Sequence, residues 1–170
     1  RTMKDINATF VEKLYECNKH KQKLLALKSI FQKGLLPIDL KGYSELSFEE
    51  SSYIDQMVFR FSKFQDTMEK KLFPALLELL GEEVKSRSFI DRLNRIEELE
   101  LLYKDEWLQL RKDRNEVAHE YSFNQEEIVD GINLIYKDID KIILIYDTFY
   151  AYCNEKFEFV KNSPILKKSE

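Results

Sequence analysis

Residues 111–121 read Arg-Lys-Asp-Arg-Asn-Glu-Val-Ala-His-Glu-Tyr and gather an Arg, an Asn, a His and a Tyr between Arg114 and Tyr121. The surrounding residues have the spacing of a helix packed on a core. At about 100° per residue, Arg114 shares one stripe with Trp107, Leu110, Val117 and Tyr121. A guanidinium on the apolar side of a helix needs a partner, so we expect Arg114 to reach a carboxylate, a subunit interface or a bound anion.

The motif holds its two most reactive residues on different faces of one helix. His119 follows Arg114 by roughly 140° around a regular helix, and it shares a face with Asn115. Arg114 and His119 therefore converge only if the helix loosens near Ala118, or if two copies of the chain meet across a two-fold axis.

An Arg and a His without metal ligands nearby suit the transesterification of a phosphodiester. A neutral imidazole at His119 can take the proton of a ribose 2′-hydroxyl or protonate the leaving oxygen, while Arg114 holds the phosphate through a fork of donors. Asn115 can orient the imidazole or bond a phosphate oxygen. Taken without its neighbours, His119 is more typical of a hydrogen-bonded core or surface histidine.

The run from Arg114 to Tyr121 matches the pattern R-x4-H-x-Y, with Asn directly after the Arg. It resembles the HEPN superfamily, and in particular the HepT-like toxins that are paired with minimal nucleotidyltransferase antitoxins. Trp107 and Leu110 upstream, and Asn124 to Glu127 downstream, are also similar to that group, over residues 48–160. The resemblance implies an all-helical homodimer whose two motifs face each other across a cleft and act as a metal-independent endoribonuclease on tRNA or mRNA.

The resemblance also implies the role of each motif residue. Arg114 and His119 would be catalytic, Asn115 would support them, and Tyr121 would be the residue that the cognate nucleotidyltransferase modifies with AMP. Some similar proteins are named substrate-binding partners of a nucleotidyltransferase, so a non-catalytic docking partner is the alternative. A third hypothesis is a structural helical dimer in which Arg114 only pairs with a carboxylate.

The charges of the chain give one argument against RNA binding and one argument for it. A formal net charge of −4 counts modestly against a nucleic-acid partner. A local patch of Arg111, Lys112 and Arg114, doubled in a dimer, can still be positive, and Arg60 and Lys63 can add phosphate contacts. Three acids weaken this patch: Asp113, Glu116 and Glu120.

Composition predicts one all-α domain over residues 1–170. Only 4 Gly and 3 Pro accompany 34% charged and 44% hydrophobic residues, so turns are few and an antiparallel bundle of four to five long helices is expected. No run of about 18 apolar residues and no signal-peptide region occurs, which predicts a soluble cytoplasmic protein without a membrane partner. Cys17 and Cys153 are expected to be reduced, and with only two histidines neither a metal site nor a cofactor is expected.

Helix boundaries are predicted from apolar spacing and capping residues. A first helix covers residues 4–33 and stops at Gly34, and a loop follows to residue 48. The capping box from Ser47 to Glu50 starts a second helix, which Pro74 should kink or break. Its three phenylalanines are expected in the core or on a dimer surface: Phe59, Phe61 and Phe64.

Three further helices complete the prediction. One runs from Ser88 to Leu102 with Ile90 facing inward, and the motif helix runs from Glu106 to about Tyr121. The last begins at a cap at Asn124 and is long enough to span the bundle. Gly131 can allow a neighbouring helix to approach closely, and a glycine that is merely tolerated is the equal alternative. Residues 162–170 are expected to form a flexible tail.

Overall fold

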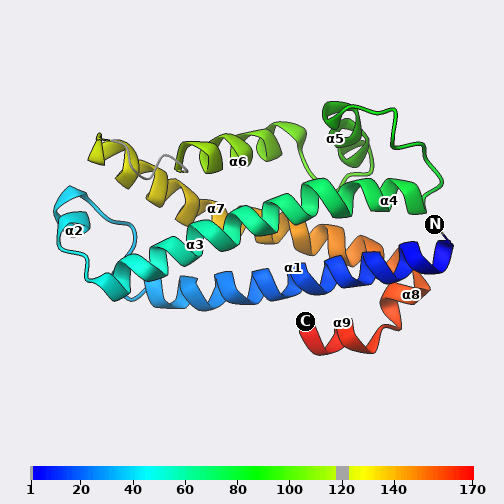
Figure 1. The fold of residues 1–170 in the computed structure, drawn as a ribbon, viewed down its shortest axis with the longest axis horizontal. Helices are drawn as coiled ribbons and strands as arrows, with labels where there is room; N and C mark the ends of the chain where they lie inside the picture. Colours follow the sequence, from blue (N-terminus) through cyan, green and yellow to red (C-terminus); the bar gives the residue numbers. More distant parts are fainter. Residues whose placement is uncertain (1, 118–122) are drawn as a thin grey trace.

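The computed structural model describes residues 2–117 and 123–170, and the regular structure among them is entirely helical (Figure 1). His119 and Tyr121 lie outside the described residues. The described elements are α1 (Met3–Phe31), α2 (Leu40–Ser44), α3 (Phe48–Thr67), the π-helical segment η1 (Met68–Leu72), α4 (Phe73–Leu79), α5 (Phe89–Glu98), α6 (Lys104–Val117), α7 (Gln125–Lys156), α8 (Glu158–Lys161) and α9 (Pro164–Ser169). The predicted all-α class is confirmed.

Three long rods form the body of the molecule: α1, α3 continued by η1 and α4, and α7 (Figure 1). Helix α1 contacts both other rods, and α6 lies across α3 and α7. Aromatic side chains fill the space between the rods, with the Phe64 and Tyr146 rings 5.1 Å apart edge to face. None of the described helices has an apolar stretch long enough to cross a bilayer.

The predicted helix starts are confirmed at three caps. Ser47 accepts from the backbone N–H of Glu50, and the Glu50 carboxylate accepts from the backbone N–H of Ser47. Ser88 forms the equivalent box at the start of α5, and Asn124 caps α7. These caps satisfy N–H groups that the first helical turn leaves without partners, which is why the sequence locates them well.

Pro74 does not break the second rod. The π-helical segment η1 immediately precedes it, and Pro74 lies in the first turn of α4, where the chain continues as a helix. A wider turn accommodates the carbonyl that the missing proline N–H leaves unpaired. Of the kink or break predicted at Pro74, the break is wrong, because the helix continues through a π-helical turn.

Helix α5 is shorter than predicted, and one residue of its predicted core face is exposed. It ends at Glu98, because Glu100 adopts a left-handed conformation with φ of 63°. Ile90 is exposed, whereas Leu93 and Ile96 are buried. The predicted inward position of Ile90 is wrong, since the short helix buries only one narrow stripe.

The C-terminal residues are folded against α1, where the sequence predicts a flexible tail. Ser163 caps α9, Pro164 occupies its first turn, and Leu166 is fully buried. The Asn18 amide of α1 donates to the Ser169 hydroxyl at 2.8 Å. A serine cap followed directly by a proline is a helix-start signal, so the sequence contains an indication of α9 that the prediction of a flexible tail did not use.

Replacing Leu166 with Ala should lower the free energy of unfolding by about 2 to 4 kcal/mol, because it removes a fully buried side chain. Ile165→Ala is the matched control, since Ile165 is half exposed on the same helix and its loss should cost less than about 1 kcal/mol. Urea denaturation of both variants measures the difference. Equal small effects would mean that α9 does not dock on α1.

Candidate functional site

Helix α6 is attached to the second rod by two ion pairs in antiparallel register. Arg111 Nε lies 2.9 Å from the Glu69 carboxylate, and Arg114 Nη1 lies 2.5 Å from Asp66 Oδ1. The same Glu69 oxygen accepts from Trp107 Nε1 at 2.9 Å. Arg111 pairs with Glu69, and Arg114, which comes later in α6, pairs with the earlier residue Asp66. The two helices therefore run in opposite directions.

Arg114 has the carboxylate partner that its position on the apolar stripe predicts. Its side chain is 26% exposed, and Asp66 is the one acid that pairs with it among the described residues. Asp66 also lies 3.7 Å from Lys70 Nζ, so this carboxylate is shared by two cations. The cluster of Arg114, Asp66 and Lys70 therefore retains a net positive charge.

Two side chains contact the guanidinium of Arg111. Glu69 binds its Nε, and the guanidinium stacks on the Phe89 ring at 4.4 Å from the centroid. These contacts are those of a cation that fixes α6, although the sequence predicts an RNA contact at this residue. Lys112, the next residue, is exposed and forms no ion pair with a described residue.

The remaining motif residues lie at the end of α6. Asn115 is exposed and lies next to Arg114 on the outer side of the helix. His119 and Tyr121 fall outside the described residues, so the convergence of Arg114 and His119 stays a prediction. The structure brings Arg114 and Asn115 to the same end of α6 and places Arg60 on α3.

The end of α6 is held closely against α7. A Cβ atom at Gly131 would lie 3.3 Å from Val117 Cγ2 and 3.4 Å from Val117 Cα. These distances are shorter than most real contacts of a Cβ atom. The predicted close approach at Gly131 is thus confirmed, and it fixes the last described turn before the His119 segment.

Two carboxyl groups missed by the sequence analysis lie buried between α6 and α7. Asp113 is 4% exposed and Asp138 is 1% exposed. Gln109 Nε2 donates to Asp113 Oδ1 at 2.8 Å, and Lys141 Nζ lies 3.8 Å from Asp138. Burial, followed by the hydrogen bond to Asp113, raises the pKa of Asp138 to about 8. Burial beside Asp113 therefore favours the protonated form of Asp138.

A signal for this pair is present in the sequence. Asp113 falls on the stripe of Leu110 and Val117, at the spacing i, i+3 and i+7, and Asp138 falls between Ile135 and Ile142 in the same way. The sequence analysis treated Asp113 as a surface acid that weakens a basic patch, and that interpretation is corrected. A charged residue on a core stripe indicates a buried polar pair.

Asp138→Asn should raise the stability of the protein at pH 7 by up to about 4 kcal/mol. The folded chain holds this proton up to about pH 8, whereas an unfolded Asp releases it near 3.8, so rising pH favours the unfolded chain between these values. The difference between variant and parent should be near zero at pH 4 and largest near pH 8. Thermal unfolding from pH 4 to 9 measures it.

Asp130→Asn is the control for this prediction, because Asp130 is exposed on the same helix. Its effect should stay within about 0.5 kcal/mol and should not depend on pH. A destabilised Asp138→Asn variant with an unchanged pH profile would contradict the shared proton.

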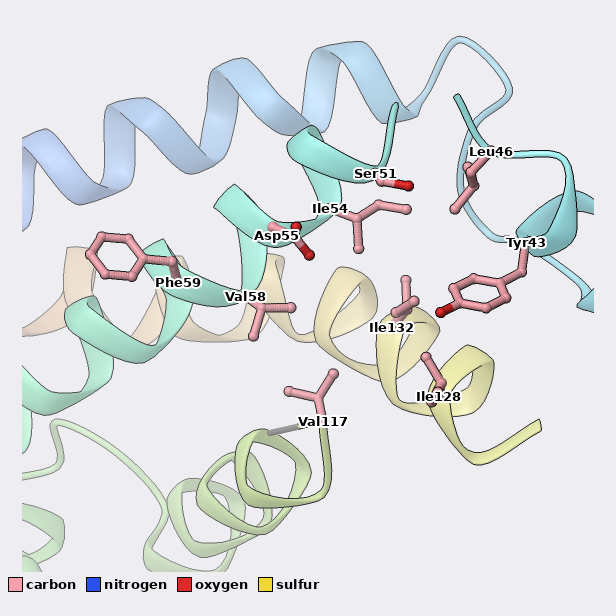
Figure 2. Close-up of a pocket in the computed structure, with 10 residues that line it drawn as sticks. All are labelled: Tyr43, Leu46, Ser51, Ile54, Asp55, Val58, Phe59, Val117, Ile128 and Ile132. Carbon is pink, nitrogen blue, oxygen red and sulfur yellow. The ribbon is translucent and has the colours of Figure 1, made fainter. Parts of the chain in front are cut away.

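A cavity of about 400 Å³ opens beside the end of α6, between α2, α3 and α7 (Figure 2). Its walls are mainly apolar, with Val117 of α6 opposite Val58 of α3. Three side chains add polar atoms: Tyr43, Ser51 and Asp55. The Tyr43 hydroxyl points toward Ile132 in this view.

Phe59 lines the same cavity and is 52% exposed, whereas Phe61 and Phe64 are fully buried. The guanidinium of Arg60 lies 5.4 Å from the centre of the Phe59 ring, and the Lys63 ammonium lies 5.7 Å from it. Phe61 and Phe64 are core residues, which is one of the two positions predicted for the three phenylalanines. Phe59 presents an exposed ring flanked by cations, and its place on a dimer surface stays a prediction.

Within residues 2–117 and 123–170, no group of three or more His, Cys, Asp or Glu side chains is placed to hold a metal ion. Comparison with known proteins finds no match among family models, curated proteins or solved structures. The functional argument therefore depends on the motif residues and their surroundings.

Proposed function

We propose that this protein is a metal-independent endoribonuclease toxin that cleaves tRNA or mRNA through Arg114 and His119 at the cleft of a homodimer. A cognate nucleotidyltransferase antitoxin neutralises it by attaching AMP to Tyr121. The observation that carries the proposal is the setting of Arg114. It is a partly exposed guanidinium, held on one side by a single carboxylate, one helical turn before the segment that contains His119.

The surroundings of Arg114 support phosphate binding. Asp66 orients the guanidinium, and Lys70 shares that carboxylate, so the cluster can still attract an anion. The planar fork of Arg114 has five donors, and Asp66 is bound through Nη1. A phosphate can therefore bind on the other side of the fork without displacing Asp66.

The reaction needs one proton acceptor and one proton donor. The ribose 2′-oxygen attacks phosphorus while its proton passes to the His119 imidazole, and the bond from phosphorus to the 5′-oxygen breaks. The 5′-oxygen takes a proton from the second imidazole of the dimer or from water. Arg114 stabilises the charge that builds on the non-bridging oxygens. The products are a 2′,3′-cyclic phosphate and a 5′-hydroxyl.

A second candidate function is a non-catalytic docking partner of a nucleotidyltransferase. Exposed aromatic side chains near the motif end of the molecule favour it, because open apolar patches are typical of protein interfaces: Phe48, Phe59 and Phe123. The third hypothesis, a purely structural Arg114, predicts an ion pair such as the one to Asp66. Cleavage of RNA separates the first function from the other two.

Arg114→Ala and His119→Ala should each lower the rate of RNA cleavage by about 100-fold or more, since each removes a group that acts in the transition state. The assay uses purified protein with EDTA and total RNA or tRNA, and intact mass first establishes that Tyr121 carries no AMP. The 5′ fragment should end in a 2′,3′-cyclic phosphate.

Arg95→Ala is the matched control, because Arg95 also forms ion pairs, with Glu82 and Glu98, but lies on α5. Its rate should stay within about twofold of the parent's, as expected for a surface residue outside the site. Cleavage that stops when chelator is added would contradict the mechanism. An unmodified, folded parent that cuts no RNA would favour the docking partner.

A further inference from the structure

The cavity beside α6 is lined by three polar side chains that form no hydrogen bond with a described residue, and one of them, Asp55, is exposed to solvent. The Asp55 carboxylate forms no hydrogen bond or ion pair with a described residue, and the same holds for the side-chain hydroxyls of Tyr43 and Ser51. The walls around them are apolar. A cavity of about 400 Å³ with a few polar groups is typical of a site for a small, flat ligand.

One face of α3 connects this cavity to Arg114. Asp55, Phe59, Lys63 and Asp66 follow one another at the spacing i, i+4, i+8 and i+11, so they lie along a single stripe of the helix. Asp66 holds Arg114 at one end of the stripe. From Val58 at the cavity to Asp66, the rise of the helix is about 12 Å.

The middle of this stripe presents the Phe59 ring and Lys63, and the Arg60 guanidinium reaches the same ring from beside the stripe. The Phe59 ring points along α3 away from Tyr43 (Figure 2), toward Lys63. Neither Arg60 nor Lys63 forms an ion pair with a described residue. An open ring beside unpaired cations is the combination that binds the bases and phosphates of single-stranded RNA.

The chemistry of the cavity favours guanine. A carboxylate only accepts hydrogen bonds, so a base that covers the exposed Asp55 must present donors to replace the bonds to water. Guanine offers two adjacent donors, N1–H and the 2-amino group, which match the two carboxylate oxygens. An apolar segment of a protein partner would leave Asp55 without a bond inside the interface, which is unfavourable. RNA fits this face better than a protein surface does.

We infer that this face of α3 binds single-stranded RNA, with a guanine in the cavity at Asp55, a neighbouring base on Phe59, and phosphates at Lys63 and Arg60 on the way to Arg114. The inference rests on the proposed ribonuclease function and adds to it the base that is recognised. The cavity and Arg114 are close enough for one strand to reach both within a few nucleotides.

The test measures binding to RNA that cannot be cleaved. Four fluorescent 2′-O-methyl oligouridine strands, with G, A, C or U at the central position, lack the attacking 2′-hydroxyl, so binding is measured whether or not the protein is a nuclease. The guanine strand should bind at least about fivefold more tightly than the others, as expected for a base read by paired hydrogen bonds.

Asp55→Asn should abolish this preference for guanine. Its affinity for the all-uridine strand should stay equal or rise, because a negative charge beside RNA is removed. Asp130→Asn, which removes an exposed acid outside the cavity, should keep the preference. A parent without guanine preference, or a preference that survives Asp55→Asn, would overturn the inference.

Phe59→Ala should weaken binding of all four strands by about tenfold through the lost stacking. Tyr103→Ala, an exposed aromatic at the start of α6, should bind like the parent. If Phe59→Ala instead converts a dimer to a monomer in sedimentation and leaves RNA affinity unchanged, the face is a protein interface and the inference fails.

The inference and the proposed function can fail separately. A parent that prefers guanine but cleaves no ordinary RNA would uphold the RNA-binding face and refute the ribonuclease. A parent that cleaves RNA without any preference for guanine would uphold the ribonuclease and refute the guanine site.

Discussion

The ion pair between Arg114 and Asp66 is the contact on which the candidate site depends. It holds a guanidinium at the end of α6 against α3, which also carries the exposed Phe59 ring and two cations, Arg60 and Lys63, that form no ion pair with a described residue. The neighbouring pair of Arg111 and Glu69 fixes the register of the two helices. These pairs therefore restrict the rotation and sliding of α6 on α3.

The opposite side of α6 is constrained by a different kind of contact. Asp113 and Asp138 are buried together, and two buried carboxyl groups are tolerated only when they share a proton. One turn after Asp113 on α6, Val117 lies close to α7, because Gly131 of α7 has no side chain. The segment that carries His119 therefore begins from a turn that is held on both sides, by α3 and by α7.

Local signals in the sequence predict most of the fold. Ser47, Ser88 and Asn124 were identified as caps because each satisfies N–H groups of its own helix, and that requirement is independent of tertiary structure. Pro74 and the C-terminal segment were misjudged, since a π-helical turn and docking on α1 arise from packing. Asp113 was misjudged because charge was given more weight than its position on a core stripe. The partner of Arg114 was predicted as a class, but its identity as Asp66 depends on helix register.

The most direct test of the account is an NMR titration of the arginine side chains with 2′-O-methyl RNA. If Arg114 binds phosphate while Asp66 orients it, the Arg114 Nε–H signal shifts saturably, and the Arg111 signal stays in place because Glu69 and Phe89 already occupy that guanidinium. If RNA binds and the Arg114 signal does not move, Arg114 is a structural ion pair and the account of the site is wrong.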